Sequence, residues 1–345
     1  MCITVDTFRV NDFSSIFCDQ PRVVVVAEIG NNHEGDLGLA RELIASAAAC
    51  GADAVKFQHF VPDRYVAVSE TSRLSRLRQF ALTNDELLSL FQYSRELEVE
   101  PFATAFDLET LKWLLNYQKV VKIASGDNNF YDLLRIAGDS GTPTIVSTGL
   151  LSMAGIIDLE KWWRLRFATP VALLHCVAAY PARSHDLNLR TIKVLSERMP
   201  HTPIGYSDHS VGITASLAAV VLGAFLIEKH FTLDHDYSDF RDHQLSANPQ
   251  ELAELVSAVR MLEQALGNGL KSVTADEILI EPSMRRSAAA RCSLFAGRIL
   301  EKADIVYLRP GHGYSPDRER ELLGRRLSQD VEKGQTILDC NLSPQ

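Results

Sequence analysis

The segment VVKIASGDNNFYDLLRIAGDSGTPTIVST, residues 120–148, contains the pattern that decides the fold. Two short apolar runs, 120–124 and 144–148, enclose a stretch with apolar residues at helical spacing, 131–140. Short apolar runs of this kind are typical of strands that are buried on both faces. A strand, a helix and a second strand in this order predict two parallel strands joined by a crossover helix.

The same alternation extends over most of the chain. Eight strands are predicted, at residues 23–29, 54–57, 101–104, 120–124, 144–148, 171–176, 204–207 and 225–230. Each is followed by a predicted helix, at 37–49, 83–97, 108–116, 131–140, 152–164, 188–199, 213–223 and 248–267, and a less regular insert occupies 59–82. Eight such units favour an α/β fold of the (β/α)8 TIM barrel type. An open doubly wound sheet is the alternative, but no G-x-G-x-x-G motif follows the first strand to support it.

The chain is predicted to contain two domains. An N-terminal extension, 1–20, precedes the barrel, which we assign to residues 21–268. A linker at 269–283 leads to residues 284–345, where short β-like pieces alternate with glycine and proline turns and no long helical pattern occurs. This second region is predicted to be a small, mostly β domain.

The composition excludes several classes of protein. Of the 345 residues, 46% are hydrophobic and 23% are charged, which is typical of globular proteins, and the net charge of −9 argues against nucleic acid as a partner. The six cysteines are scattered without a C-x-x-C pair, which indicates reduced thiols rather than a disulfide framework. We see no signal-peptide pattern and no apolar run of the roughly 20 residues that a membrane span needs. We therefore expect a cytoplasmic protein with no membrane partner.

Polar residues occur at the carboxyl end of nearly every predicted strand, where barrel enzymes build their active sites. They include Glu28, Lys56, Gln58, Thr104, Lys122, Ser125, Asp127, Ser207, His209, Glu228 and His230. Because strand side chains alternate in direction, Glu228 and His230 share one face, and Lys229 points the other way, toward the helices. A single lysine or histidine at a strand end is usually an exposed or structural residue. A polar residue at the same end of so many strands indicates a common site instead.

These residue types favour one kind of chemistry. Lys56 and Lys122, in otherwise apolar strands and close to serine and threonine hydroxyls, suit a phosphate or a carboxylate. His209 and His230, from neighbouring strands, suit a divalent metal with open positions, since imidazole binds Mn, Fe or Zn. Such a metal polarises a carbonyl as a Lewis acid, and Glu28 could orient or deprotonate a water. The pattern predicts a metal-assisted condensation or aldol-type reaction on a phosphorylated acid.

Seven segments in the same order resemble the sialic acid synthase (N-acetylneuraminate synthase) family. They are AEIGNNHEGDLGLARELI (27–44), GADAVKFQ (51–58), VKIASGDN (121–128), LLHCVAAYP (173–181), IGYSDHSVGI (204–213), LGAFLIEKHFTLD (222–234) and DHQLSANPQEL (242–252). Near the end of the chain, YLRPGHGYSP (307–316) resembles the RPG-x-G-x-S-P stretch of the small antifreeze-like (SAF) domain of that family. The resemblance implies a TIM barrel followed by a SAF domain.

The resemblance also implies an activity. Family members condense phosphoenolpyruvate with the open-chain aldehyde of an N-acyl amino sugar, releasing phosphate and a nine-carbon 3-deoxy-ulosonic acid, with Mn²⁺ or Mg²⁺ as cofactor. The implied metal ligands are His209 and His230; Lys56, Thr104, Lys122, Ser125 and Ser207 would hold phosphoenolpyruvate; Gln58, Tyr180 and Asp242 would bind the sugar. The implied catalytic residues are Glu28, which positions the attacking water, Glu228, beside the reacting carbons, and Asp127. Arg309 would reach the sugar's acyl group from the partner subunit of a domain-swapped homodimer.

Three departures from the family pattern leave the acceptor sugar open. Asp127 ends a Ser-Gly-Asp segment where the family has Ser-Gly-Glu, Ala178 replaces a polar residue of the Cys-Thr-(Ser/Asn)-x-Tyr-Pro stretch, and Phe240-Arg241 precedes the second Asp-His in place of Gly-Pro or Gly-Thr/Ser. The acceptor is N-acetylmannosamine, or a diacetamido sugar that leads to legionaminic or pseudaminic acid, or something rarer. An eight-carbon synthase of the 3-deoxy-octulosonate-8-phosphate type is a second interpretation, against which the SAF-like tail argues. A non-catalytic sugar-binding barrel is a third, against which the intact lysines and histidines argue.

Overall fold

The computed structural model describes residues 22–344 of the chain. The chain divides into two compact units between Gly267 and Asn268, and we describe each unit by itself. The predicted N-terminal extension, 1–20, lies outside the described residues.

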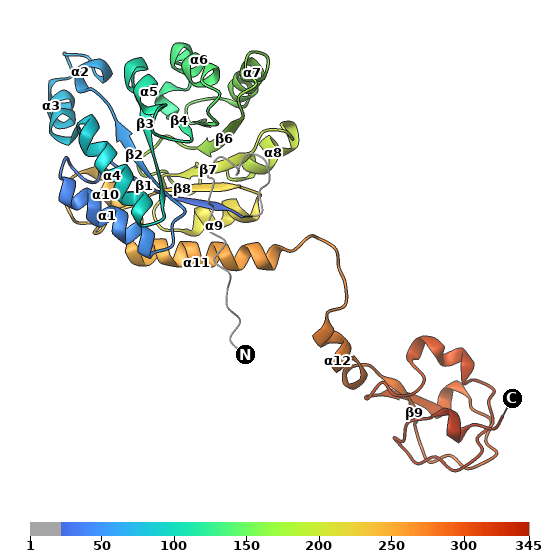
Figure 1. Ribbon diagram of the computed structural model, residues 1–345. Helices are drawn as coiled ribbons and strands as arrows, with labels where there is room; N and C mark the ends of the chain where they lie inside the picture. The colour runs from blue at the N-terminus through green and yellow to red at the C-terminus, as the bar shows by residue number, and fades with distance from the viewer. Residues whose placement is uncertain (1–21, 345) are drawn as a thin grey trace. The chain divides into compact units, whose positions relative to one another are not determined.

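Eight parallel strands close into a barrel in the first unit, which confirms the predicted (β/α)8 fold (Figure 1). They are β1 (Val24–Gly30), β2 (Ala54–His59), β3 (Glu100–Ala105), β4 (Val121–Ile123), β5 (Thr144–Ser147), β6 (Val171–Cys176), β7 (Ile204–Asp208) and β8 (Leu226–His230). Each strand pairs with the next in the sequence, and β8 pairs with β1. Closure removes both free edges of the sheet, so every strand has two hydrogen-bonded neighbours.

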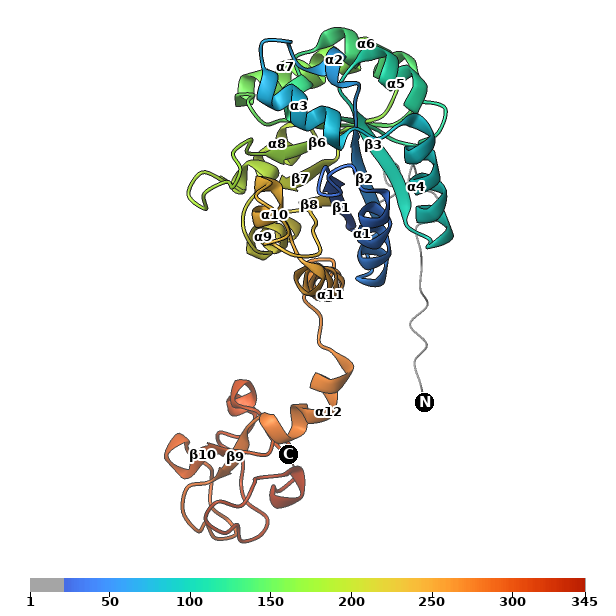
Figure 2. The same ribbon diagram turned by 90° about the vertical axis from the view of Figure 1, so that its left-hand side faces the viewer.

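The helices follow the predicted alternation. They are α1 (Leu37–Ala49), α4 (Asn84–Glu96), α5 (Leu108–Leu114), α6 (Tyr131–Asp139), α7 (Met153–Arg164), α8 (Arg190–Arg198), α9 (Thr214–Val221) and α11 (Pro249–Leu266). Figure 2 shows α1 and α4 side by side on the outside of the sheet. The predicted capping box at the start of α4 is confirmed, because the Thr83 hydroxyl accepts a hydrogen bond from the Glu86 amide and the Glu86 carboxylate accepts one from the Thr83 amide.

Three short helices of the barrel unit were not predicted. The insert predicted to be irregular contains α2 (Pro62–Tyr65) and α3 (Thr71–Phe80), and α10 (Arg241–Leu245) follows β8. The sequence of α3 is mostly polar, and it is stabilised by Leu74, Leu77 and Phe80, which recur at helical spacing and are buried. The packing of these three residues is enough to stabilise a helix whose composition is otherwise polar. Three apolar residues within ten give only a weak helical pattern, so the helix was not predicted.

Most buried apolar side chains of the barrel unit fill two layers. The larger layer lies between the strands and the surrounding helices. The smaller one fills the barrel interior, and consists of Val24, Val26, Ala54, Phe102, Val120, Ile145, Ala172, Leu174, Phe225 and Leu226. Most of these residues belong to the amino-terminal halves of their strands. The interior is therefore closed at that end, and only the carboxyl ends of the strands leave room for polar groups.

The second unit is small and largely irregular. It contains α12 (Ala275–Met284), an antiparallel pair formed by β9 (Ser287–Ala290) and β10 (Ile305–Leu308), and the 3-10 helices η3 (Lys302–Asp304), η4 (Pro316–Glu321) and η5 (Asp339–Asn341). Its core is formed by Ala288, Ala290, Leu294, Leu300, Ile305, Tyr314, Leu322, Leu327, Val331, Ile337 and Leu342. Helix α12 occupies most of the second half of the predicted linker. Within residues 22–344, no helix combines the length and the apolar character that crossing a membrane requires.

Candidate active site

Two lysines and two glutamates form a buried charge cluster at the carboxyl ends of four strands. Glu28 on β1 and Lys56 on β2 are paired positions of the sheet, and Lys56 Nζ lies 2.8 Å from Glu28 Oε2. Glu228 on β8 lies 3.7 Å from Lys56 Nζ and 3.5 Å from the Nζ of Lys122 on β4. All four side chains are buried. Two cations and two anions thus balance each other inside the barrel, which makes their burial tolerable.

Hydroxyl groups from neighbouring strands complete this cluster. Thr104 on β3 accepts a hydrogen bond from Lys56 over 3.3 Å, and Ser147 on β5 accepts one from Lys122 over 2.8 Å. Ser207 on β7 donates to the β8 carboxylate over 2.9 Å. Ser147 was recognised as the end of the predicted fifth strand, but no role in the site was predicted for it. Because Lys122 and Ser147 both point into the barrel, the period-2 alternation of β4 and β5 was the signal that could have found it.

The two glutamates differ in acidity. Burial raises the pKa of Glu28, and Lys56 only partly opposes this effect. Burial acts on Glu228 in the same direction, but Lys122 and Lys56 outweigh it, so that the pKa of Glu228 is lowered. Glu28 is therefore the stronger base of the two, and Glu228 stays anionic. Two carboxylates whose environments push their pKa values apart are typical of active sites that use one group for proton transfer and the other for its charge.

The carboxylate of Glu28 is held in place by Gln58 on β2, which is oriented in turn by Asn31 after β1. Gln58 Nε2 donates to Glu28 Oε1 over 3.2 Å, and Asn31 Nδ2 donates to Gln58 Oε1 over 2.9 Å. Gly30 has a φ of +55°, and a Cβ there would lie 3.1 Å from Glu28 Oε1. A side chain at Gly30 would be strained and would crowd the carboxylate. Asn31 was not among the predicted site residues, although it follows the predicted first strand directly.

The two predicted metal ligands lie next to each other. The ring centroids of His209 and His230 are 5.4 Å apart, and the Tyr180 ring lies 4.1 Å from that of His209. Burial, together with the positive charges around it, lowers the pKa of His230 well below its usual value, so the imidazole is neutral. Its Nδ1 atom is buried and has no hydrogen-bond partner among residues 22–344. A neutral imidazole with an unpartnered ring nitrogen is the form that binds metals.

His209 and His230 fit a divalent cation. His209 Nδ1 lies 2.9 Å from the carbonyl oxygen of Val177. In metal-binding histidines, the ring nitrogen that does not bind the metal usually has such a partner, which fixes the orientation of the ring. The described part of the chain contains no group of three or more His, Cys, Asp or Glu side chains arranged to hold a metal ion. A metal here would therefore have two imidazole ligands and take its other ligands from water or from substrate oxygens.

Ser125 and Cys176 connect the charge cluster region to the histidines. Ser125 Oγ donates to Cys176 Sγ over 3.4 Å and accepts from the Gly149 amide over 3.1 Å, and Cys176 Sγ lies 3.6 Å from His209 Nδ1. A Cβ at Gly149 would come within 2.6 Å of Ser125 Oγ, so glycine permits the close approach of these two loops. Cys176 was recognised as the end of the predicted sixth strand, but no role was predicted for it, although its position on β6 continues the inward series of Leu174.

Tyr180 and Asp242, two of the predicted sugar contacts, are joined through Arg241 beside His209. Tyr180 lies against His209, and the Arg241 guanidinium carbon lies 4.7 Å from the centroid of the Tyr180 ring. Arg241 Nε also donates to Asp242 Oδ1 over 3.2 Å. Burial raises the pKa of Asp242, and Arg241 partly opposes the shift. A phenol and a buried carboxylate offer the hydrogen-bonding groups that a sugar requires.

Two predicted residues stand apart from these contacts. Asp127 ends the 3-10 helix η2 (Ser125–Asp127), and its side chain makes no hydrogen bond or ion pair with the residues that the structure describes. Burial alone raises its pKa to about 6. Arg309 is exposed and directly follows β10 in the second unit, so its predicted contact with the sugar of a partner subunit stays a prediction.

Lys229 points away from the site, as the alternation predicted. It is fully buried, lies 3.4 Å from Asp208 Oδ2 and donates a hydrogen bond to the Ser210 carbonyl. Asp208 Oδ2 also accepts a hydrogen bond from Ser216 Oγ on α9 over 2.6 Å. Lys229 and Asp208 thus form a structural ion pair between the barrel and its helices, with polar partners that offset the cost of burial.

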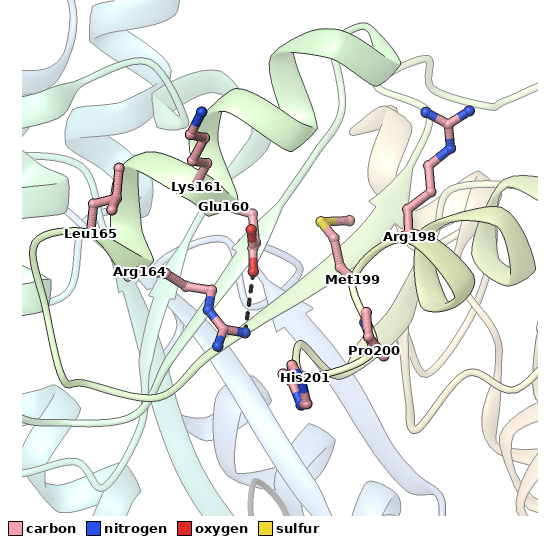
Figure 3. A pocket seen from close by; sticks show the side chains of 8 residues that line it. All are labelled: Glu160, Lys161, Arg164, Leu165, Arg198, Met199, Pro200 and His201. Carbon is pink, nitrogen blue, oxygen red and sulfur yellow. Dashed lines mark ion pairs between the residues drawn. The ribbon is translucent and has the colours of Figure 1, made fainter.

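A cavity of about 420 Å³ lies away from this site, between α7 and α8. It is lined by Glu160, Lys161, Arg164, Leu165, Arg198, Met199, Pro200 and His201 (Figure 3). The Arg164 guanidinium within it lies 3.5 Å from the Glu160 carboxylate. Because the chain passes from the ends of α7 and α8 into β6 and β7, the cavity lies at the amino-terminal ends of these strands. That end of a TIM barrel usually contributes stability rather than catalysis.

Known proteins resemble this chain along most of its length. The model of the NeuB family matches residues 43–271. The chain is 34% identical over 332 residues to N,N'-diacetyllegionaminic acid synthase of Legionella pneumophila, covering 91% of this chain and 93% of that protein. It is also 34% identical over 334 residues to N-acetylneuraminate-9-phosphate synthase of Homo sapiens, covering 91% of each. A crystal structure of N-acetylneuraminic acid (sialic acid) synthetase from Leptospira borgpetersenii, in complex with citrate, has a TM-score of 0.71 at 36% identity and covers 75% of this chain and 90% of that one.

The closed barrel and the polar groups at the carboxyl ends of its strands define a TIM-barrel enzyme. The chain belongs to the NeuB family, and its class is that of the sialic acid-type synthases. The resemblance of the barrel motifs to this family is thereby confirmed, whereas the assignment of the tail to the SAF type stays a prediction.

Proposed function

We propose that the protein condenses phosphoenolpyruvate with the open-chain aldehyde of an N-acyl amino sugar, forming a nine-carbon 3-deoxy-ulosonic acid and phosphate. The observation that carries the proposal is the buried cluster of Lys56, Lys122, Glu28 and Glu228 beside two neighbouring histidines. Membership of the NeuB family supports it, as do the relatives named as synthases of legionaminic and N-acetylneuraminic acids.

Phosphoenolpyruvate carries two anionic groups, which the cluster suits. Burial lowers the pKa of Lys122, so a bound phosphate or carboxylate would restore the stability of its charged form. Lys56 offers a second ammonium group at the same end of the barrel, and the hydroxyls of Thr104, Ser125 and Ser207 offer further hydrogen bonds. In this proposal the substrate anion competes with the two glutamates for the lysines, so binding frees the glutamates to act on the reacting atoms.

The reaction forms one carbon–carbon bond. C3 of phosphoenolpyruvate bonds to the aldehyde carbon of the sugar, and the aldehyde oxygen takes up a proton to become a hydroxyl. A water adds its oxygen to C2, and one of its protons passes to the Glu28 carboxylate, whose raised pKa makes it an effective base. The bond between C2 and the phosphate oxygen then breaks, the second water proton leaves with the phosphate, and C2 becomes the ketone of the product. The proton accepted by Glu28 balances the one that the aldehyde oxygen takes up.

The remaining residues position these groups. Glu228 stays anionic between Lys122 and Ser207, where its charge would face the reacting carbons. Gln58 fixes the Glu28 carboxylate. Asp127, with a pKa of about 6, can exchange a proton near neutral pH, and its catalytic role rests on its place after β4 in the family motif.

His209 and His230 would hold a divalent metal, Mn²⁺ or Mg²⁺, beside the sugar. When bound, such an ion supplies a Lewis acid that polarises the aldehyde. Tyr180, which lies against His209, and Asp242, which is paired with Arg241, would bind the sugar hydroxyls.

We also propose that the enzyme works as a domain-swapped homodimer, in which Arg309 reaches the sugar bound by the other subunit. The supporting observation is the apolar surface of residues 270–284. Leu270, Val273, Ile278, Leu279, Ile280 and Met284 are all exposed there, and α12 has no buried residue. Exposed apolar side chains concentrated in one short segment mark an interface with another surface. This segment is the start of the second unit, and the β pair and turns that follow it are the part that we assign to the SAF type.

Phosphate release tests the proposed function. The purified protein is incubated with phosphoenolpyruvate and a panel of N-acyl amino sugars, with Mn²⁺ or with EDTA. We expect release that needs both a sugar and the metal, and we expect His230→Ala to lose the stimulation by metal. His185→Ala, at an exposed histidine, is the matched control. No release with any sugar in the presence of Mn²⁺ would contradict the proposal.

A further inference from the structure

The cavity between α7 and α8 concentrates positive charge in an acidic protein. Lys161, Arg164 and Arg198 are cations at neutral pH, and the single carboxylate among the eight described residues that line the cavity is that of Glu160. Three positive charges against one negative charge leave a local net charge of +2, whereas the whole chain carries −9. A concave surface with charge of one sign attracts ligands of the opposite sign. The cavity therefore favours an anion.

The charge of Glu160 is already engaged within the cavity wall. Glu160 Oε1 accepts a hydrogen bond from Thr202 Oγ1 over 2.9 Å and lies 3.5 Å from Arg164 Nη1. Thr202 is buried and the Glu160 side chain is 12% exposed, whereas 47% of the Arg164 side chain is exposed. Figure 3 shows the Arg164 guanidinium turned toward this carboxylate. A buried hydroxyl and a carboxylate thus hold an exposed guanidinium in one orientation, which lowers the entropic cost of binding a ligand.

The two other cations have no partner inside the protein. Among the residues that the structure describes, the side chains of Lys161 and Arg198 make no hydrogen bond or ion pair. The neighbouring acidic residues outside the cavity do not neutralise them, because Glu197 is paired with Lys193 and Asp158 forms no ion pair within the described chain. Lys161 extends from α7 and Arg198 from α8 in Figure 3, so each helix supplies an uncompensated charge to the cavity.

A second hollow adjoins the cavity and offers room for an organic group. It shares Arg164 and His201 with the cavity, has a volume of about 220 Å³, and is lined also by Phe167, Pro170 and Val171. Together the two spaces reach the range of about 300–1,000 Å³ that is typical of small-molecule sites. Guanidinium and ammonium groups bind phosphate well, and a phosphate monoester, with up to two negative charges, matches the local charge of +2.

We propose that this cavity binds a small organic phosphate, with the phosphate group at Arg164, Lys161 and Arg198 and the organic body in the adjoining hollow. The site lies at the amino-terminal ends of β6 and β7, whereas Lys56 and Lys122 belong to the charge cluster at the carboxyl ends of the strands. The two anion sites are thus at opposite ends of the barrel. The inference goes beyond the proposed condensation and does not depend on it.

Isothermal titration calorimetry tests this site. The full chain is titrated with ADP, with glucose 6-phosphate, with inorganic phosphate and with adenosine. We expect at least one of the two organic phosphates to bind with a Kd below about 1 mM and about tenfold more tightly than inorganic phosphate, because the body adds contacts in the hollow. Adenosine, which has no phosphate, should not bind.

Variants locate the binding. The double variant Arg164→Gln, Arg198→Gln should weaken the binding of the organic phosphate by about 10- to 100-fold, as expected for the loss of charge-assisted hydrogen bonds. Arg166→Gln removes an arginine that lies over Trp162 and does not line the cavity, so this matched control should bind as the wild type does. Circular dichroism verifies that each variant folds.

Three results would overturn the inference. Binding of neither organic phosphate would do so, and binding no tighter than that of inorganic phosphate would indicate a nonspecific anion contact only. An unchanged affinity in the double variant would place the ligand elsewhere, for example at Lys56 and Lys122. None of these measurements uses the synthase reaction, so each result leaves the proposed function intact.

Discussion

Within the charge cluster, the pKa of a side chain depends more on its neighbours than on its residue type. Glu28 and Glu228 are both buried glutamates beside Lys56, yet their pKa values shift in opposite directions. The difference arises because Glu228 also faces Lys122 and Ser207, whereas the further partner of Glu28 is the neutral amide of Gln58. A second cation is thus enough to decide which carboxylate can serve as a base.

Replacing Glu28 by Gln tests its role as the base. We expect kcat/KM to fall by about 100- to 10,000-fold, which is the range for loss of a general base, while phosphoenolpyruvate still binds. The raised pKa also predicts that wild-type activity declines as the pH falls, with a midpoint above the usual glutamate value of 4.5, because the carboxylate must be deprotonated to accept a proton. Steady-state kinetics and a binding titration measure both effects. Glu42→Gln, at an exposed glutamate of α1, should match the wild type.

Asp127 predicts a pH-dependent contribution to stability. Its pKa of about 6 exceeds the ordinary value of 3.8, so between these values the folded protein holds its proton more tightly than the unfolded chain does. Stability therefore decreases as the pH rises through this window, and Asp127→Asn escapes the loss. Since the side chain is partly exposed, we expect the variant to gain about 1 kcal/mol relative to the wild type between pH 4 and pH 7. Urea unfolding at both pH values measures the difference, and parallel stabilities would contradict it.

At the scale of elements, the alternation of inward-facing and outward-facing residues along the strands explains which side chains form most of the site. Alternation places Glu228 and His230 inside the barrel and Lys229 among the helices, and their contacts agree. Period-2 reasoning works here because β7 and β8 are regular and buried on both sides. Period-2 reasoning gave no access to Asn31, because this residue lies outside the strands, where backbone direction depends on tertiary contacts that a single sequence does not reveal.

The Lys229–Asp208 pair predicts a stability effect that is separate from catalysis. Lys229→Met leaves the Asp208 carboxylate buried without its cation, so we expect a loss of about 3–5 kcal/mol in the free energy of unfolding. The double variant Asp208→Asn, Lys229→Met removes both charges and should recover part of that loss. Lys193→Met, at an exposed position of α8, is the control. Equal stability of the single and double variants, measured by denaturant unfolding, would show that the pair is not coupled.

At the scale of the whole molecule, the sequence predicted more of the barrel than of the second unit. The barrel repeats one strand–helix pattern eight times, so the fold can still be predicted when one strand or helix is assigned wrongly. The second unit has only the two short strands β9 and β10, and its small core is drawn from turns and isolated bridges. No periodicity specifies such a structure, because its residues are brought together by long-range contacts. The role of Arg309 therefore depends on the proposed dimer alone.

Subunit complementation tests that dimer. His230→Ala damages the barrel site, and Arg309→Ala damages the contribution of the second unit, so each variant alone is expected to have little activity. If the second unit completes the site of the other subunit, mixed dimers contain one intact site, formed by the barrel of the Arg309→Ala chain and the second unit of the His230→Ala chain. Unfolding and refolding the two variants together in equal amounts should then restore about a quarter of the wild-type activity. A mixture of His230→Ala with Glu28→Gln, both damaged in the barrel, should restore none. Activity in the first mixture no greater than the mean of its two components would exclude a site shared between subunits.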